Sequence, residues 1–433
     1  MTSSTSSSDQ RINHTHPDDP RRNQARRTVA VKTILLGGSA MLVALMIVNL
    51  GVSLLRETFP NPFSIQRIET AGNALSAALE IPDDDPREIV YVLGSSLIQF
   101  GFSPDIFDQA MARRGTPTIS FNYGFGNADP SIHEKFALKL ARTFAAQPEK
   151  IDRIIYEFSP FQATQQRAKS TGQLDHAATA ALMNAEDLRE ILLEDHDEAI
   201  ALLNTHYLRE GVPAEAITNM LALPIKNAGL VEASLSAEAP EPLEGRGWQL
   251  YNQLKEEWPQ ASPPGGWIDK HRGGLPPSAS PEAMALAEEV MQVMQDPYRM
   301  EAARKQRIAC CDMLDLHIDD QMLAHFIQAI KYAQSVSKNV DLLLMPRNQD
   351  VIQLSETGYQ NLQAALQRIQ QETGINIIDL SVDPYFPVQD FFDADHLTIF
   401  KGREKVSRLL ADTLQAEQDI PEIPERPSQL AAE

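Results

Sequence analysis

The sequence has little cysteine: only two residues in 433, the neighbours Cys310 and Cys311. They fall in a segment with helical spacing, where a bridge between adjacent cysteines would be strained. We therefore expect two ordinary thiols, with no disulfide framework and no zinc knuckle. A redox or metal role for the pair is the less favoured alternative.

Positive charge is also scarce, since 38 lysines and arginines stand against 59 aspartates and glutamates, for a formal net charge of -21. Nucleic acid is excluded as an expected partner, because phosphate binding relies on clustered lysine and arginine. The glycine patterns of dinucleotide sites and P-loops are missing, so we expect no cofactor and no metal. The composition, 43% hydrophobic and 22% charged, is that of a globular protein. Its 433 residues exceed the chain length that one hydrophobic core usually supports.

Charged residues are absent from 33 to 55, an apolar run that at the helical rise spans about 30 Å of hydrocarbon. We predict a transmembrane helix over 29 to 56, preceded by a disordered tail over 1 to 28. Basic residues dominate the flank before the run, which places the N-terminus in the cytoplasm and the main domain outside, on the periplasmic side of a bacterial inner membrane. A cleaved signal peptide and a buried core helix are the less favoured alternatives.

Farther along, apolar runs of strand length alternate with segments of helical spacing. Strands are expected at 89–94, 116–122, 151–158, 340–346 and 375–381. Helices are expected at 104–115, 131–147, 322–335 and 398–417. This alternation predicts an α/β fold: a five-stranded parallel sheet with helices on both faces, of the flavodoxin-like type.

The alternation is interrupted over 162–339, so the sheet domain is predicted in two halves, 57–161 and 340–417, around a mainly helical insertion. An acidic, proline-rich tail over 418–433 is expected to be flexible. A Pro/Gly-rich stretch of the insertion contains all three tryptophans, Trp248, Trp258 and Trp267. They are expected to form either a platform or lid for a sugar ligand, or the packing of an irregular loop.

Ligands of a parallel sheet bind beyond the carboxyl ends of its strands, so the residues after each strand are the candidates. The first turn, "LGSS", places Ser96 after Gly94, which permits a tight bend. Ser96 is a candidate nucleophile, and a phosphate-binding turn or a helix cap are the alternatives. The fourth strand ends in "MPRNQD", which makes Arg347 and Asn348 candidates for binding an acyl donor or a sugar, or plain surface residues.

The second strand is followed by "FNYGFGNADP". Gly124 and Gly126 let the backbone approach a ligand closely, and their amides are candidate donors to a developing oxyanion. The carboxamides of Asn122 and Asn127 are further candidate donors. The alternative is a loop that uses glycine and asparagine for positive φ.

The fifth strand leads into "FFDADHLTIFKG", which should bring His396 to the same sheet edge as Ser96. Asp393 precedes His396 by three residues, a spacing that brings a carboxylate round to the imidazole Nδ1. Asp395 is a second possible partner. A serine hydroxyl needs such a base, because it is almost wholly un-ionised at its own pKa.

These motifs together resemble the SGNH (GDSL-like) hydrolase superfamily: a Gly-x-Ser turn, a Gly/Asn loop, and an Asp-x-x-His followed by "LTIFKGREKVSRLLADTL". The chain is similar in particular to membrane-anchored members that work with membrane-bound O-acyltransferases, such as the DltD and alginate-acetylation proteins. The resemblance covers about 89 to 160 and 340 to 417. It implies that Ser96 is the nucleophile, His396 the general base and Asp393 its orienter, with oxyanion amides from Ser96 and Gly126.

The chain departs from this family pattern in two places. Ser95 replaces the usual aspartate before the nucleophile. The asparagine of the third block is not evident, because the third strand runs into Glu157, Ser159 and Gln162. Either Asn127 supplies the missing donor or the oxyanion hole is incomplete.

The resemblance implies an extracytoplasmic O-acyltransferase or esterase, without a cofactor, that acts beside a membrane-bound O-acyltransferase. It would transfer or remove an O-acyl group, acetyl by expectation, on a cell-envelope or exported polysaccharide. One alternative is a non-catalytic accessory or scaffold subunit of a polysaccharide modification or export complex, which a long separation between Ser96 and His396 would favour. A phosphate-binding loop of another α/β fold is a weaker alternative, since no lysine-containing cradle supports it.

Overall fold

The computed structural model describes residues 63–126, 128–183, 185–194, 281–398 and 401–418, with short pieces at 32–33, 36–41, 43–44, 47, 196–197 and 199–202. The chain divides into two compact units, Met1–Phe59 and Pro60–Glu433. No helix within the described residues is long and apolar enough to cross a membrane. Most of the predicted span at 33–55 lies outside those residues, as do the predicted N-terminal tail and the three tryptophans.

Five parallel strands form one sheet in the order β2-β1-β3-β4-β5. Their bounds are β1 Glu88–Gly94, β2 Thr118–Gly124, β3 Ile151–Glu157, β4 Ser337–Leu344 and β5 Asn376–Asp379. The predicted five-stranded parallel sheet is therefore confirmed. The interior strand β1, which lies between β2 and β3, is a continuous apolar run that is buried from Ile89 to Gly94, as a strand covered on both faces requires. The strand order reverses between β1 and β3, which is where parallel sheets of this type bind their ligands.

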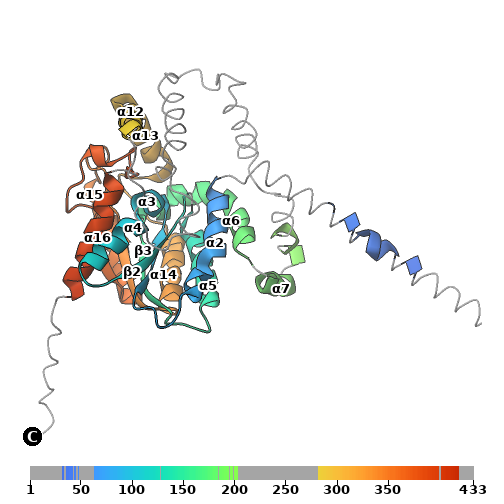
Figure 1. Cartoon of the computed structure of the whole chain (residues 1–433). Coiled ribbons are helices and arrows are strands. Elements are labelled where there is room, and N and C mark those ends of the chain that lie inside the picture. The colour runs from blue at the N-terminus through green and yellow to red at the C-terminus, as the bar shows by residue number, and fades with distance from the viewer. Residues whose placement is uncertain are drawn as a thin grey trace, which may run out of the picture. The chain divides into compact units, whose positions relative to one another are not determined.

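The helices fall into two groups that pack separately. Their bounds, with those of the short 3-10 helices, are α2 Phe63–Ala74, η1 Leu75–Glu80, α3 Ser96–Gly101, α4 Pro104–Arg113, α5 Pro130–Thr143, η2 Pro160–Ala163, α6 Gln165–Leu182, α7 Ala185–Glu194, α12 Pro281–Met294, α13 Pro297–Cys311, α14 Asp320–Gln334, α15 Glu356–Thr373, η4 Val388–Asp390 and α16 Gly402–Gln418. α16 packs against α3 and α4, whereas α5 packs against α2, α6 and α14, and α14 packs against α15 (Figure 1). Right-handed crossovers place these two groups on opposite faces of the sheet.

α14 corrects the boundary of the predicted insertion. It lies inside the predicted 162–339 segment, yet it packs on α5 and β4 and forms the crossover from β3 to β4. Its apolar residues recur at helical period and are buried: Leu323, Phe326, Ile327 and Ile330. The sheet domain therefore includes α14, while residues 203–280 of the predicted insertion lie outside the described residues.

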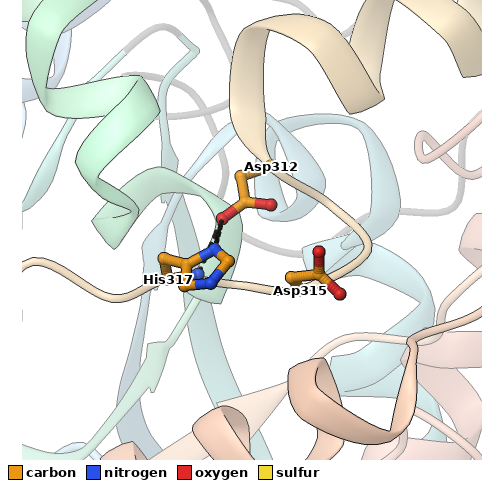
Figure 2. Close-up of side chains that lie close together, drawn as sticks. All are labelled: Asp312, Asp315 and His317. Atoms are coloured by element: carbon orange, nitrogen blue, oxygen red, sulfur yellow. Dashed lines mark hydrogen bonds and ion pairs between the residues drawn. The ribbon is translucent and has the colours of Figure 1, made fainter.

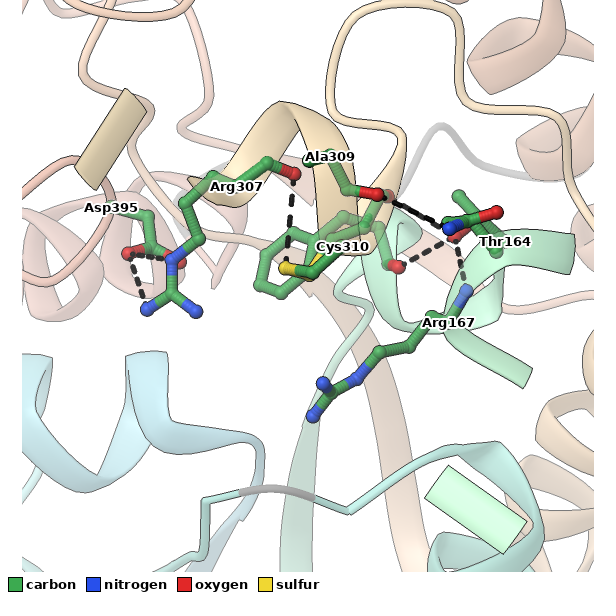
Figure 3. Close-up of a disulfide and its surroundings, with 9 residues drawn as sticks. Thr164, Arg167, Arg307, Ala309, Cys310 and Asp395 are labelled. Carbon is green, nitrogen blue, oxygen red and sulfur yellow. Dashed lines mark hydrogen bonds and ion pairs between the residues drawn. A yellow bond between two sulfur atoms is a disulfide. The ribbon is translucent and has the colours of Figure 1, made fainter. Parts of the chain in front are cut away.

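The expectation of two free thiols is wrong in the structure, where Cys310 and Cys311 form a disulfide (Figure 3). α13 ends at Cys311, and Asp312 takes a left-handed backbone conformation with φ of 51°. Both cysteines belong to α13, as the helical spacing indicated, and they are its last two residues. The carbonyl of Cys311 accepts a hydrogen bond from the Thr164 hydroxyl at 3.1 Å, which joins this end of α13 to the start of α6.

Candidate active site

The turn from β1 into α3 presents Ser96 at the carboxyl edge of the sheet. Ser95 caps α3, because its Oγ accepts a hydrogen bond from the Leu97 amide at 3.1 Å, and Ser96 is the first helical residue. Gly94 makes this turn possible: a Cβ there would lie 2.6 Å from both Glu157 Oε2 and Ile98 Cγ1. Any larger residue would displace the turn, so the position requires glycine.

His396 is carried by a tight turn between the bridged residues Phe391 and Leu397. Asp393 Oδ1 accepts hydrogen bonds from the amides of Asp395 and His396, at 3.0 and 2.8 Å. This arrangement is an aspartate turn, and the following helix α16 begins only at Gly402. The turn fixes the imidazole close to the carboxylate that precedes it.

The three predicted catalytic residues meet at one point. His396 Nε2 lies 2.8 Å from Ser96 Oγ, and His396 Nδ1 lies 2.9 Å from Asp393 Oδ2. A serine, an imidazole and a carboxylate in this sequence of contacts form the arrangement in which the imidazole takes the serine proton while the carboxylate holds the ring. The ring of Phe100 packs edge-on against His396, with centroids 5.3 Å apart. The arrangement can therefore generate a serine nucleophile.

Asp395, the other carboxylate of the turn, has a different partner. Its Oδ1 accepts a hydrogen bond from Arg307 Nε at 3.1 Å and forms an ion pair with Arg307 Nη2 at 3.0 Å (Figure 3). The same oxygen lies 3.3 Å from His396 Nδ1. Sequence reasoning missed Arg307, which comes from α13 within the predicted insertion. No local pattern marks it, because the contact depends on how α13 packs beside the turn.

The electrostatics of the triad favour a charged imidazole. Burial acts to lower the pKa of His396, but the carboxylates of Asp393 and Asp395 outweigh it and raise that pKa to about 8. Burial acts to raise the pKa of Asp393, and the adjacent imidazolium reverses the direction, so its pKa lies well below the ordinary value. Burial and the neighbouring Asp393 carboxylate raise the pKa of Asp395. The pair of Asp393 and His396 is therefore ionised at neutral pH.

Glu157 is a buried carboxyl directly beneath the nucleophile turn. It ends β3, and its Oε2 accepts a hydrogen bond from the Ser95 amide at 2.6 Å. Burial raises its pKa to about 7, opposed by that amide and by the charge of His396. Glu157 therefore brings a carboxyl from the neighbouring strand to the turn that holds Ser95 and Ser96.

The predicted oxyanion residues have other contacts in this structure. A Cβ at Gly124 would lie 2.3 Å from the Gln99 nitrogen and 2.8 Å from the Ser95 oxygen, so this glycine admits the α3 backbone and not a ligand. The Asn122 carboxamide donates to the Ile98 and Phe102 carbonyls and so holds the end of α3. The Gly126 amide donates to Gln99 Oε1 at 3.1 Å. Asn127 lies outside the described residues.

Arg347 and Asn348 lie at a cavity of about 40 Å³ beside the triad turn, which Leu97, Ala394 and Asp395 also line. The Asn348 side chain donates to the Asp393 carbonyl at 3.3 Å, so it braces the turn that carries His396. Arg347 donates to the Met313 carbonyl at 3.4 Å, and burial lowers its pKa to about 10, which leaves it charged. Both residues reach the predicted edge and are not plain surface residues.

Within the part of the chain that the structure describes, two groups of side chains have the composition of a metal site. One is the triad turn itself, Asp393, Asp395 and His396, and the other is Asp312, Asp315 and His317. In the second group the His317 ring and amide form hydrogen bonds with Asp312 (Figure 2). Asp315 accepts a hydrogen bond from the Ser355 hydroxyl. In the first, both ring nitrogens of His396 are engaged by Asp393 and Ser96. Each residue of both groups has at least one ligand-type atom in a hydrogen bond, while Asp395 Oδ2 is buried without a hydrogen-bond partner among the described residues.

Comparison of the chain with protein-family models gave no match, and comparison with curated proteins gave none either. The functional conclusion therefore rests on the geometry of Ser96, His396 and Asp393 and on the residues around them.

Proposed function

We propose that the protein is a serine-dependent O-acyltransferase or esterase of the SGNH type. The observation that carries the proposal is the continuous chain of contacts from Ser96 Oγ through the His396 ring to the Asp393 carboxylate, at 2.8 and 2.9 Å. The parallel sheet with its reversal between β1 and β3 supports it, because Ser96 follows β1 and Glu157 ends β3 at that reversal.

The first half-reaction forms an acyl-enzyme. Ser96 Oγ attacks the ester carbonyl carbon while its proton passes to His396 Nε2, and the carbonyl π electrons move onto oxygen. Asp393 stabilises the imidazolium through Nδ1 and keeps the ring in the tautomer that accepts at Nε2. The tetrahedral intermediate then collapses, the bond to the alkoxy leaving group breaks, and His396 returns the proton to that oxygen.

The second half-reaction repeats these steps with a new nucleophile. A hydroxyl group of the acceptor, or water, gives its proton to His396 and attacks the acyl carbon, and Ser96 leaves with the proton returned. A sugar hydroxyl as acceptor makes the enzyme a transferase, and water makes it an esterase. We propose an O-acetylated envelope or exported polysaccharide as the polymer concerned.

The proposed location and partner rest on the sequence. The uncharged run at 33–55 with its basic flank supports a single-pass anchor that leaves the catalytic domain on the periplasmic side of a bacterial inner membrane. An anchored domain meets acceptors and acyl donors that are held at the membrane, which favours transfer over free hydrolysis. A membrane-bound O-acyltransferase that supplies the acyl group is the partner we propose.

The experiment uses p-nitrophenyl acetate with the full-length protein. Wild type should release nitrophenol in a burst and then a steady phase, with an acetyl group on Ser96 detected by mass spectrometry of the quenched protein. Ser96→Ala should show neither the burst nor the adduct. Addition of an oligosaccharide acceptor should divert acetyl from acetate to a sugar ester if the enzyme is a transferase. Equal release by wild type and Ser96→Ala would contradict the proposal.

A non-catalytic accessory subunit of a polysaccharide modification or export complex is the second candidate. One observation favours it: the Gly126 amide, an expected oxyanion donor, is engaged by Gln99 Oε1. The absence of any burst in the wild-type protein would support this candidate.

A further inference from the structure

Gln99 is a buried amide side chain that lies one helical turn after the nucleophile. Its exposure is 1%, and it shares a face of α3 with Ser96 because residues three apart in a helix are neighbours. Gly126 lies against both: a Cβ built on it would be 3.4 Å from Ser96 Cβ and 3.7 Å from Gln99 Oε1. The Gln99 carboxamide and the Ser96 side chain therefore both lie against Gly126.

The two ends of the Gln99 carboxamide have different surroundings. Oε1 accepts the Gly126 amide at 3.1 Å, while Nε2 is buried without a hydrogen-bond partner among the described residues. In the opposite orientation the Nε2 donor would face the Gly126 N–H donor, with no hydrogen bond between them. The Gly126 amide therefore assigns the oxygen and the nitrogen of the Gln99 carboxamide to their positions. A buried donor without a partner is costly and therefore calls for an explanation.

We infer that Gln99 Nε2 is an oxyanion donor of the proposed serine acyl-transfer reaction, in place of the asparagine missing from the third strand. The inference rests on that proposed function. Gly126 is then a positioning residue, because its amide acts through Gln99 by holding the carboxamide in the donating orientation. The sequence predicted the Gly126 backbone amide as an oxyanion donor, and the inference assigns that role to the Gln99 side chain instead.

The donor acts while charge builds on the carbonyl oxygen. As the Ser96 Oγ to carbon bond forms and the π electrons move to oxygen, a Gln99 N–H hydrogen bond stabilises the anion without transferring its proton. When the carbonyl re-forms and the leaving group departs, that hydrogen bond weakens again. Such a donor lowers the barrier and leaves ground-state substrate binding nearly unchanged.

Two substitutions separate a donor from a support. Gln99→Met removes both hydrogen-bonding ends with little change of volume. Gln99→Glu keeps an acceptor for the Gly126 amide but removes the donor. If Gln99 only supported Gly126, the Glu variant would keep wild-type kinetics. If Gln99 is an oxyanion donor, both variants should lose about 10²–10³-fold in kcat for p-nitrophenyl acetate, with KM changed only a few-fold.

The same loss should be seen in the rate of Ser96 phosphonylation by a fluorophosphonate, while the Tm of each variant reports whether it is folded. A folded Met or Glu variant with wild-type kcat and wild-type labelling rate would overturn the inference. Failure of wild type itself to label would instead overturn the proposed function.

A crystal structure of the phosphonylated wild-type protein gives a test that needs no variant. The phosphonyl oxygen should lie within hydrogen-bond reach of Gln99 Nε2, about 2.7–3.2 Å. An oxygen that lies beyond 4 Å from Nε2, bonded only to backbone amides, would contradict the assignment.

Discussion

Ser96 Oγ and His396 Nε2 lie 2.8 Å apart although 300 residues separate them in the chain. The two side chains come close in space because all five strands are parallel, so the residue after β1 and the turn after β5 lie at the same edge of the sheet. The proposed serine nucleophile requires a base within this reach, whereas a serine that only caps a helix does not. The predictions below follow from this contact and from the groups packed around it.

Asp393→Asn should lower kcat by about 10⁴-fold with little change in KM, because an amide favours the wrong imidazole tautomer and leaves the imidazolium unstabilised. Asp395→Asn is the matched control: its principal bonds are to Arg307, and Asp393 still holds the ring. Steady-state kinetics of both variants measure the difference. A larger loss for the Asp395 variant would assign the orienting role to Asp395.

The pH dependence of kcat/KM should follow His396. A base with a pKa of about 8 is mostly protonated at neutral pH, so kcat/KM should rise through about pH 8 and level off above it. Arg307 acts to lower that pKa, and Arg307→Gln should therefore shift the rise to higher pH. A profile that is flat from pH 6 to 9, or one that shifts to lower pH in the variant, would contradict this account of the site.

Glu157 should make the protein less stable as the pH rises. Its folded pKa of about 7 exceeds the ordinary value of 4.5, so the folded state binds the proton more tightly, and stability falls as pH rises from about 4.5 through about 7. Glu157→Gln removes this dependence. Above pH 8 the variant should be more stable than wild type by up to about 3 kcal/mol, and at pH 4 it should show no such advantage. Denaturant unfolding at the two pH values measures both quantities.

Gly124→Ala should displace α3, because the new Cβ would collide with backbone atoms of Gln99 and Ser95 and neither can move independently. We expect a loss of about 1–3 kcal/mol in the free energy of unfolding. Gly126→Ala is the stability control, since the nearest atom to its Cβ is at 3.4 Å, an ordinary contact. Equal stability of the two variants would show that the β2 to α3 contact is looser than described.

The strands and the triad could be predicted from the sequence because each depends on a local pattern. β1 and β3 are apolar runs of strand length, and Asp393 and His396 share one short turn. The helix α15 was missed although Ser355 caps its start and Gly374 ends it in a left-handed conformation. Apart from these two end signals, only the regular spacing of its apolar residues marked it, because its sequence is polar on most sides.

The surroundings of the triad could not be predicted, because they depend on contacts between distant elements. Arg307 meets Asp395 across 88 residues, and Gly126 meets Gln99 across 27. Gly124 was assigned to ligand approach, whereas it admits a helix backbone. A glycine in a sequence indicates that some group comes close to the backbone, but it does not indicate whether that group is a ligand or another part of the protein.

The most direct test of the central claim is covalent labelling by a fluorophosphonate, with the modified residue located by peptide mapping. Displacement of fluoride by Ser96 Oγ requires the base and geometry described here. We predict a single adduct on Ser96 in wild type, at least 10³-fold slower labelling in His396→Ala, and none in Ser96→Ala, each variant retaining the wild-type fold by circular dichroism. Equal labelling of wild type and Ser96→Ala, or an adduct on another residue, would contradict the account.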